Sequence, residues 1–161
     1  MDKELKELNQ FLGKAMLSTY AGGGKETKPQ RAGFRELECQ EGKWRYRDSY
    51  SGHYQSWGQE TIWLNGKPYW TQLYGGGMEP DCLNDKEMDR KCFEFLKKSL
   101  SAGEKKESFQ PRGPKRLQDG DFQYECEWNG DIEKFSGYEK IFYGKRLVFT
   151  HHFLGGVFRH K

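Results

Sequence analysis

The amino-acid sequence predicts an α+β fold in which two helices accompany antiparallel sheet. Two segments have apolar residues at the three- and four-residue spacings of an amphipathic helix, and much of the rest alternates apolar with polar residues around Asn-Gly turns. Short turns join antiparallel strands, because parallel strands need a long crossover. The length of 161 residues suits one domain, so we expect residues 1–161 to form a single domain.

The two predicted helices cover residues 2–20 and a segment that begins near Asn84-Asp85 and ends at Gly103. Asn and Asp are favoured residues at a helix N-cap, and glycine favours a helix end, as at Gly22–Gly24. One face of each helix is apolar: Leu5, Leu8, Phe11, Leu12, Ala15 and Met16 in the first, and Met88, Cys92, Phe93, Leu96 and Leu100 in the second.

Two Asn-Gly pairs predict hairpin turns. Asn65-Gly66 separates the strand-like segments 60–64 and 68–74. Asn129-Gly130 follows 122–128, where Phe, Tyr, Cys and Trp alternate with polar residues. We interpret the clusters Gly22–Gly24 and Gly75–Gly77 as helix stops and tight turns, because neither fits a phosphate-binding motif. Gly155-Gly156 closes the second half as Gly75–Gly77 closes the first.

Short motifs recur in the same order in both halves, which predicts an internal duplication with repeats 1–80 and 81–161. Glu60-Thr61-Ile62 resembles Glu139-Lys140-Ile141 at an offset of 79, and Leu37-Glu38-Cys39 resembles Tyr124-Glu125-Cys126 at an offset of 87. Each repeat would be a helix followed by a four-stranded meander. The alternative is chance similarity in a chain rich in Gly and aromatic residues. This alignment gives the first repeat an extra loop at 48–57, where we expect function.

Strand alternation places polar side chains on aromatic faces. Gln72 would share a face with Trp70 and Tyr74, and His151 one with Phe149 and Phe153. A polar group on a buried face is costly unless it is paired, so these groups either satisfy one another in the core or line a pocket. The candidate ligand-binding residues are Arg31, Asp48, Tyr50, Trp57, Glu60, Trp70, Gln72, Tyr74, Arg112, Glu139 and His151.

Arg31 and Arg112 occupy similar places in the two halves, beside Gly and Pro. A guanidinium group held by a stiff loop suits a carboxylate or a phosphate. The alternative is a structural role, with Arg31 paired to Glu139 and Arg112 paired to Glu60.

Composition excludes several classes. With 27 basic and 24 acidic residues, the net charge of +3 is too small to indicate nucleic-acid binding. No apolar run is long enough to cross a bilayer, and the charged N-terminus lacks a signal peptide, so we expect a cytoplasmic protein without a membrane partner. The widely spaced cysteines at 39, 82, 92 and 126 favour buried thiols over a zinc site. We expect no metal and no cofactor.

Several segments resemble an uncharacterised bacterial domain family that occurs alone and fused behind helix-turn-helix regulators. The resembling segments are 19–24, 44–52, 58–60, 65–68, 111–114 and 153–156, which together span nearly the whole chain. The resemblance implies no established activity. It implies a sensor that reads a small effector, and any regulatory role would need a separate partner.

We therefore expect a module that binds a small molecule, with anions among the candidates. Trp57, Trp70 and Tyr74 would stack on the ligand, the two arginines would contact an anion, and Glu60 and Glu139 would orient polar groups. Two alternatives stay open. One is a small hydrolase or isomerase with Glu60, Glu139 and His151 as acid–base groups; the other is a structural or protein-interaction domain, such as a homodimer through exposed aromatic residues.

Overall fold

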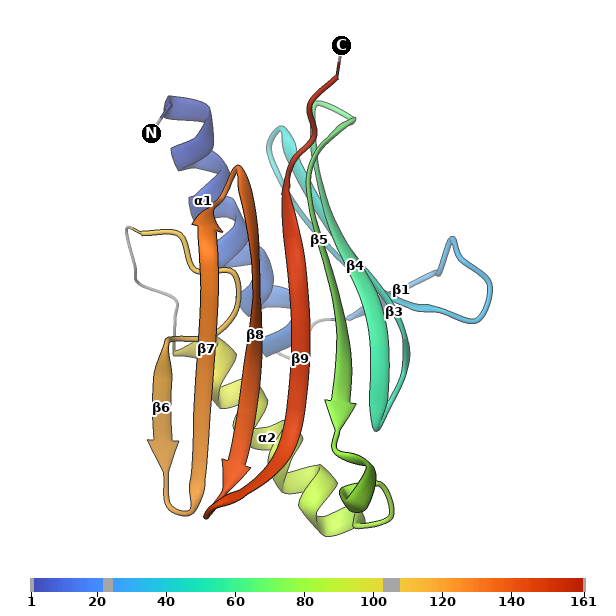
Figure 1. Ribbon diagram of the computed structural model, residues 1–161. Coiled ribbons are helices and arrows are strands. Elements are labelled where there is room, and N and C mark those ends of the chain that lie inside the picture. The colour runs from blue at the N-terminus through green and yellow to red at the C-terminus, as the bar shows by residue number, and fades with distance from the viewer. Residues whose placement is uncertain (1, 22–24, 103–107, 161) are drawn as a thin grey trace.

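The computed structural model describes residues 2–21, 25–102 and 108–160. Two helices, α1 (Lys3–Met16) and α2 (Lys86–Ser101), cover one face of a nine-stranded antiparallel sheet (Figure 1). The sheet order is β1-β2-β3-β4-β5-β9-β8-β7-β6. This arrangement confirms the α+β class. The strands are β1 Glu26–Thr27, β2 Arg35–Glu41, β3 Trp44–Gly52, β4 Gln55–Leu64, β5 Lys67–Met78, β6 Arg116–Asp119, β7 Phe122–Asp131, β8 Lys134–Tyr143 and β9 Arg146–Val157.

Both helices lie where the sequence predicts them. α1 continues through a π-helical turn at Leu17–Ala21, and a short 3₁₀ helix at Pro80–Cys82 precedes α2. The Asp85 side chain caps α2 by accepting a hydrogen bond from the Met88 amide at 2.9 Å, which satisfies one of the free N–H groups of the first turn. The glycines predicted to end the helices, at 22–24 and 103, lie outside the described residues.

One predicted hairpin turn is in place and the other lies three residues further on. Asn65 and Gly66, both with positive φ, turn the chain between β4 and β5. Asn129 and Gly130, in contrast, are still paired within β7, and the chain turns at residues 132–133. The turn is fixed there because Ile132 is buried and its carbonyl accepts a hydrogen bond from the Trp70 indole at 3.1 Å.

The loop expected at 48–57 does not exist, because these residues belong to β3 and β4. The two strands stay paired from Trp44 opposite Leu64 to Gly52 opposite Ser56, so that only residues 53–54 form the turn. The expectation came from aligning residues 37–39, which lie in β2, with residues 124–126, which lie in β7. In the first half α1 precedes five strands, of which β1 has only two residues, and in the second half α2 precedes four. The internal duplication itself stays a prediction.

The two meanders join where β5 pairs with β9, and glycines permit this contact. Gly75–Gly77 lies inside β5 and not in the turn that we predicted. At Gly76 φ is +131°, and a Cβ there would lie 2.1 Å from the carbonyl oxygen of Thr150 in β9. Only glycine fits this position, since it has no Cβ to strain the backbone or to collide with the neighbouring strand.

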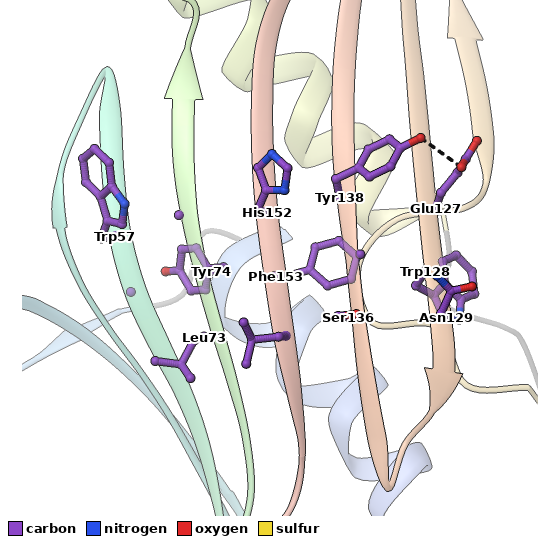
Figure 2. A pocket seen from close by; sticks show the side chains of 14 residues that line it. Trp57, Leu73, Tyr74, Glu127, Trp128, Asn129, Ser136, Tyr138, His152 and Phe153 are labelled. Atoms are coloured by element: carbon purple, nitrogen blue, oxygen red, sulfur yellow. Dashed lines mark hydrogen bonds between the residues drawn. The ribbon is translucent and has the colours of Figure 1, made fainter.

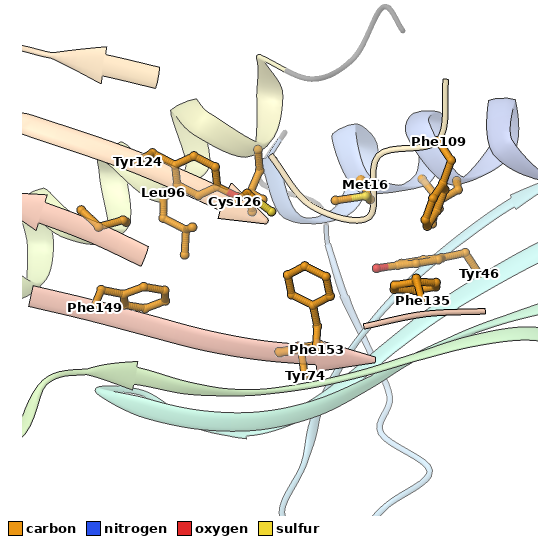
Figure 3. Close-up of a cluster of buried hydrophobic side chains, with 14 of the residues drawn as sticks. Met16, Tyr46, Tyr74, Leu96, Phe109, Tyr124, Cys126, Phe135, Phe149 and Phe153 are labelled. Atoms are coloured by element: carbon orange, nitrogen blue, oxygen red, sulfur yellow. The ribbon is translucent and has the colours of Figure 1, made fainter. Parts of the chain in front are cut away.

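The core lies between the sheet and the helices and is rich in aromatic residues (Figure 3). Phe11 of α1 stacks on Trp44, and Phe95 of α2 packs against Phe122 of β7. Large rings bury much apolar area per residue, which supplies a core in a chain that is only 34% hydrophobic. Of the four free cysteines, Cys39 is half-buried and the others are buried.

Candidate functional site

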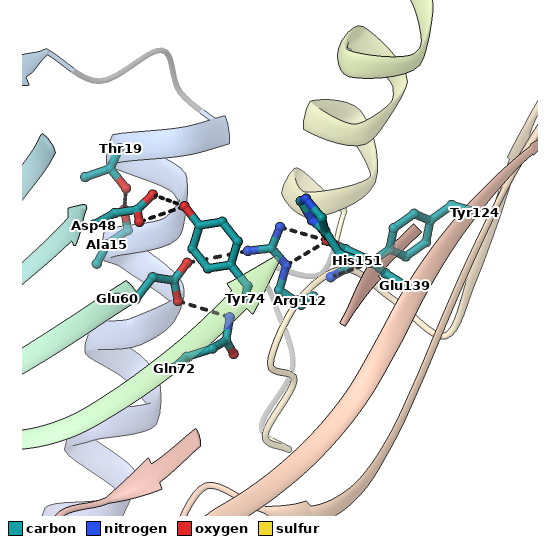
Figure 4. Close-up of polar contacts among 11 residues, drawn as sticks. Ala15, Thr19, Asp48, Glu60, Gln72, Tyr74, Arg112, Tyr124, Glu139 and His151 are labelled. Carbon is teal, nitrogen blue, oxygen red and sulfur yellow. Dashed lines mark hydrogen bonds and ion pairs between the residues drawn. The ribbon is translucent and has the colours of Figure 1, made fainter. Parts of the chain in front are cut away.

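The structure brings most of the candidate polar residues together on the helix-covered face of the sheet. Asp48, Glu60 and Gln72 lie opposite one another on β3, β4 and β5, and Glu139 lies opposite His151 on β8 and β9. Arg112 reaches them from the segment before β6 (Figure 4). All six are buried. We call this set the central polar cluster: Asp48, Glu60, Gln72, Arg112, Glu139 and His151.

Arg112 links the two halves of the sheet. Its Nε and Nη2 atoms contact Glu139 Oε1 at 2.9 and 2.8 Å, and its Nη1 lies 3.5 Å from Glu60 Oε1. The guanidinium also lies over the Tyr74 ring, 5.2 Å from its centroid. The predicted pairing of Arg112 with Glu60 is therefore present but secondary, and Glu139 is the main partner. A buried guanidinium needs such a carboxylate, because an unpaired charge in the core costs several kcal/mol.

Glu139 is the most fully bonded carboxylate of the cluster. Besides Arg112, it contacts His151 Nδ1 at 2.9 Å and accepts a hydrogen bond from the Tyr124 hydroxyl at 2.6 Å. Burial alone would raise the pKa of Glu139, but the charge of Arg112 and the bonds from His151 and Arg112 lower it to about 2. Burial lowers the pKa of His151, so its ring is neutral and donates from Nδ1 to Glu139.

Asp48 and Glu60 face each other, and fewer hydrogen bonds and positive charges offset the burial of these two carboxylates than offset the burial of Glu139. Burial raises the pKa of Glu60 to about 8, and the charge of Asp48 adds to the effect. Burial also raises the pKa of Asp48 to about 6, against a hydrogen bond of 2.8 Å from the Tyr74 hydroxyl. The pair therefore retains one proton near neutral pH, since two adjacent buried carboxylates resist double ionisation.

The pKa of Glu60 makes stability depend on pH. Between pH 6.5 and about 8 the folded protein keeps the Glu60 proton, whereas the unfolded chain, with a pKa near 4.5, has lost it. We expect the free energy of unfolding to fall as pH rises through this window, by at most about 1.4 kcal/mol per pH unit. His151 opposes this trend only in the lower part of the window, because the unfolded chain finishes losing this proton about one unit above its pKa of 6.5. Urea unfolding at several pH values measures how the free energy of unfolding changes with pH. If a Glu60→Gln variant showed the same pH dependence, Glu60 would not be its cause.

Five of the candidate residues are not members of the cluster. Arg31 is exposed and packs over the Phe34 ring at 3.8 Å, so the predicted pairing with Glu139 is wrong. Trp70 is buried in the core and cannot stack on a ligand there as we expected. Tyr50 is half-buried on β3, and Trp57 points to the opposite face of the sheet. Tyr74 contacts the cluster through Asp48 and Arg112.

The opposite face of the sheet, which the helices leave uncovered, carries a hollow of about 720 Å³ (Figure 2). Trp57 of β4 is 60% exposed at its edge, and Leu73 and Leu154, which pair across β5 and β9, are 45% and 55% exposed in its floor. The indole lies over Gly75, where a Cβ would come within 2.3 Å of the ring. We call this feature the outer hollow.

Polar groups line the side of the outer hollow formed by β7, β8 and β9. The Tyr138 hydroxyl donates a hydrogen bond to Glu127 Oε2 at 2.9 Å, and His152 lies on the neighbouring strand. The candidate residues chosen from the sequence did not include Leu73, Leu154, Tyr138 or His152. A signal was present, because leucines at 73 and 154 stand at outward strand positions where a solvated sheet face would carry polar residues.

Fold and site together define the class of this protein: an α+β protein with a helix-covered sheet and a hollow on the sheet's open face. The chain belongs to the family described as "Domain of unknown function (DUF5680)", which matches residues 48–158. Neither curated proteins nor solved structures gave a match. In the described part of the chain, no helix is long and apolar enough to span a membrane, and no three His, Cys, Asp or Glu side chains are grouped so as to hold a metal ion.

Proposed function

We propose that this protein is a small-molecule-binding module whose ligand lies in the outer hollow. The observation that carries the proposal is the exposed Trp57 indole beside Leu73 and Leu154 in a hollow of about 720 Å³. Ligand pockets usually have volumes of about 300–1,000 Å³, with apolar walls and a few polar groups. The outer hollow has both, since Tyr138, Glu127 and His152 adjoin its apolar floor.

The central polar cluster supports the fold in this proposal and does not bind the ligand. Arg112 and Glu139 already bond to each other and are only 4% and 0% exposed, and Asp48 is bonded by the Tyr74 hydroxyl. A ligand in the cluster would have to break these bonds and open the core. In the outer hollow a ligand covers side chains that are exposed in its absence, so binding gains apolar burial without unfolding.

Removing the Trp57 indole is expected to abolish most of the binding. The test is a thermal-shift screen of a metabolite library, because a compound that binds the native state raises its melting temperature. Trp57→Ala should reduce the shift from any hit to near zero. Trp63→Ala is the matched control, because Trp63 lies on the same strand and its ring packs under Arg45 at 4.3 Å, outside the lining of the hollow.

The screen also separates the alternatives. Hits that stabilise both tryptophan variants equally would place the ligand elsewhere and contradict the proposal. If no compound binds and Trp57→Ala instead reduces the molecular mass measured by light scattering, the open face pairs with a second copy of the chain. Turnover that Glu60→Gln abolishes in a folded protein would favour the acid–base alternative.

A further inference from the structure

A second hollow of about 530 Å³ adjoins the outer hollow on the same face of the sheet. Leu73 and Leu154 line both, so the two hollows are parts of one groove across β5 and β9. Val157 and Phe158 extend the apolar lining at the far end. We call the combined feature the outer groove. Its continuous apolar floor suits a ligand that is longer than a single ring.

The strand register gives the length of this ligand. Trp57 lies in the row of Gly75, and Lys134 lies in the row of Thr71, four residues further along β5. Strands rise by about 3.3 Å per residue, so the two rows are roughly 13 Å apart. Leu73 and Leu154 form the row between them. A molecule that contacts both ends must therefore be elongated, with an apolar middle.

The two ends of the outer groove carry opposite charges. The charged residues that line the far hollow are Glu133, Lys134 and Arg159. Arg159 pairs with Glu133, so the net charge of this lining is positive. Glu127 lines the outer hollow beside Tyr138, in the row of strand residues that also contains Trp57 but four strands away from it. An acidic head group would be attracted to Lys134 and repelled by Glu127, which fixes the direction in which an amphipathic anion lies.

We propose that the outer groove binds a medium-chain carboxylate, with its acyl chain between Trp57 and the two leucines and its head group at Lys134. This inference rests on the proposed function, because it assigns a ligand class to the same face. The geometry matches both parts of such a molecule: the length and apolar floor fit the chain, and the charge of Lys134 fits the carboxylate. A cationic amphiphile of equal length fits only the first part.

The test uses decanoate and decylamine as probes, titrated calorimetrically below their micelle concentrations into the full chain. Decanoate is expected to bind, and Lys134→Glu should lower its affinity by roughly five- to tenfold. The substitution both removes an exposed attraction and adds an exposed repulsion, and each has a small effect. Lys97→Glu, on the exposed face of α2, changes the net charge equally and should leave the affinity unchanged within about twofold. Trp57→Ala should weaken both probes.

Each of the other possible results contradicts either the carboxylate assignment alone or the proposed function as well. Decylamine binding as tightly as decanoate, or decanoate binding that ignores Lys134→Glu, overturns the carboxylate while the groove stands. If library compounds bind only when Trp57 is present and decanoate does not bind, the carboxylate assignment is likewise overturned while the groove stands. If neither probe nor any library compound binds the wild type, both the carboxylate and the proposed function fall.

Discussion

Glu139→Gln is expected to lower the free energy of unfolding by about 3–5 kcal/mol, the usual cost of removing one partner from a buried ion pair. The carboxylate holds Arg112 through two nitrogens and also bonds to His151 and Tyr124. A neutral amide leaves the Arg112 charge buried with only Glu60, at 3.5 Å, beside it. Urea unfolding near neutral pH measures the loss.

The matched control is Glu60→Gln, which we expect to cost about 1 kcal/mol or less at neutral pH. Glu60 is mostly protonated there, because burial raises its pKa to about 8, so an amide resembles its native state. The neighbouring Gln72 can turn its amide over to accept from the new NH₂ group, since its Oε1 has no hydrogen-bond partner among the described residues. Equal losses in the two variants would contradict the unequal roles assigned to these carboxylates.

Gly76→Ala is expected to destabilise the fold by about 3 kcal/mol or more, because it combines backbone strain with a collision. A φ of +131° disfavours any residue with a Cβ, and that Cβ would lie 2.1 Å from the Thr150 carbonyl oxygen. The variant must separate β5 from β9, where the two halves of the sheet join. Thermal and urea unfolding should both show the loss.

Gly13→Ala controls for the general effect of adding a methyl group. Gly13 lies inside α1 with no atom within 4 Å of a Cβ built there, so the change should stabilise the protein by about 0.5–1 kcal/mol through helix propensity. If Gly76→Ala unfolded at the same urea concentration as the wild type, the close β5–β9 contact would not exist as described.

The sequence predicts the helices well because their apolar faces repeat regularly and Asp85 supplies a local cap. It also places Gln72 and His151 on the aromatic faces of their strands, which the structure buries under the helices, since alternation decides the face of every strand residue. It does not show how near two strands lie. The partner of Arg112 could therefore not be predicted from the sequence. Arg112 approaches Glu139 from an irregular segment whose path depends on tertiary packing.

The two errors in the strand pattern have similar causes. Asn129-Gly130 has the local chemistry of a turn, but burial of Ile132 moves the turn three residues further. The loop at 48–57 was inferred from an alignment shifted by one strand. The outer groove went unnoticed because alternation directs attention to the core-facing residues, while Leu73 and Leu154 stand at the positions between them.

The location of the ligand is tested most directly by an amide NMR spectrum of the protein titrated with decanoate or with a hit from the thermal-shift screen. If the ligand lies on the open face, the largest shift changes fall on Leu73, Gly75, His152 and Leu154, and those of Arg112 and Glu139 stay small. Changes that instead centre on Arg112, Glu139 and His151 would show that the ligand enters the central polar cluster, and would contradict the account.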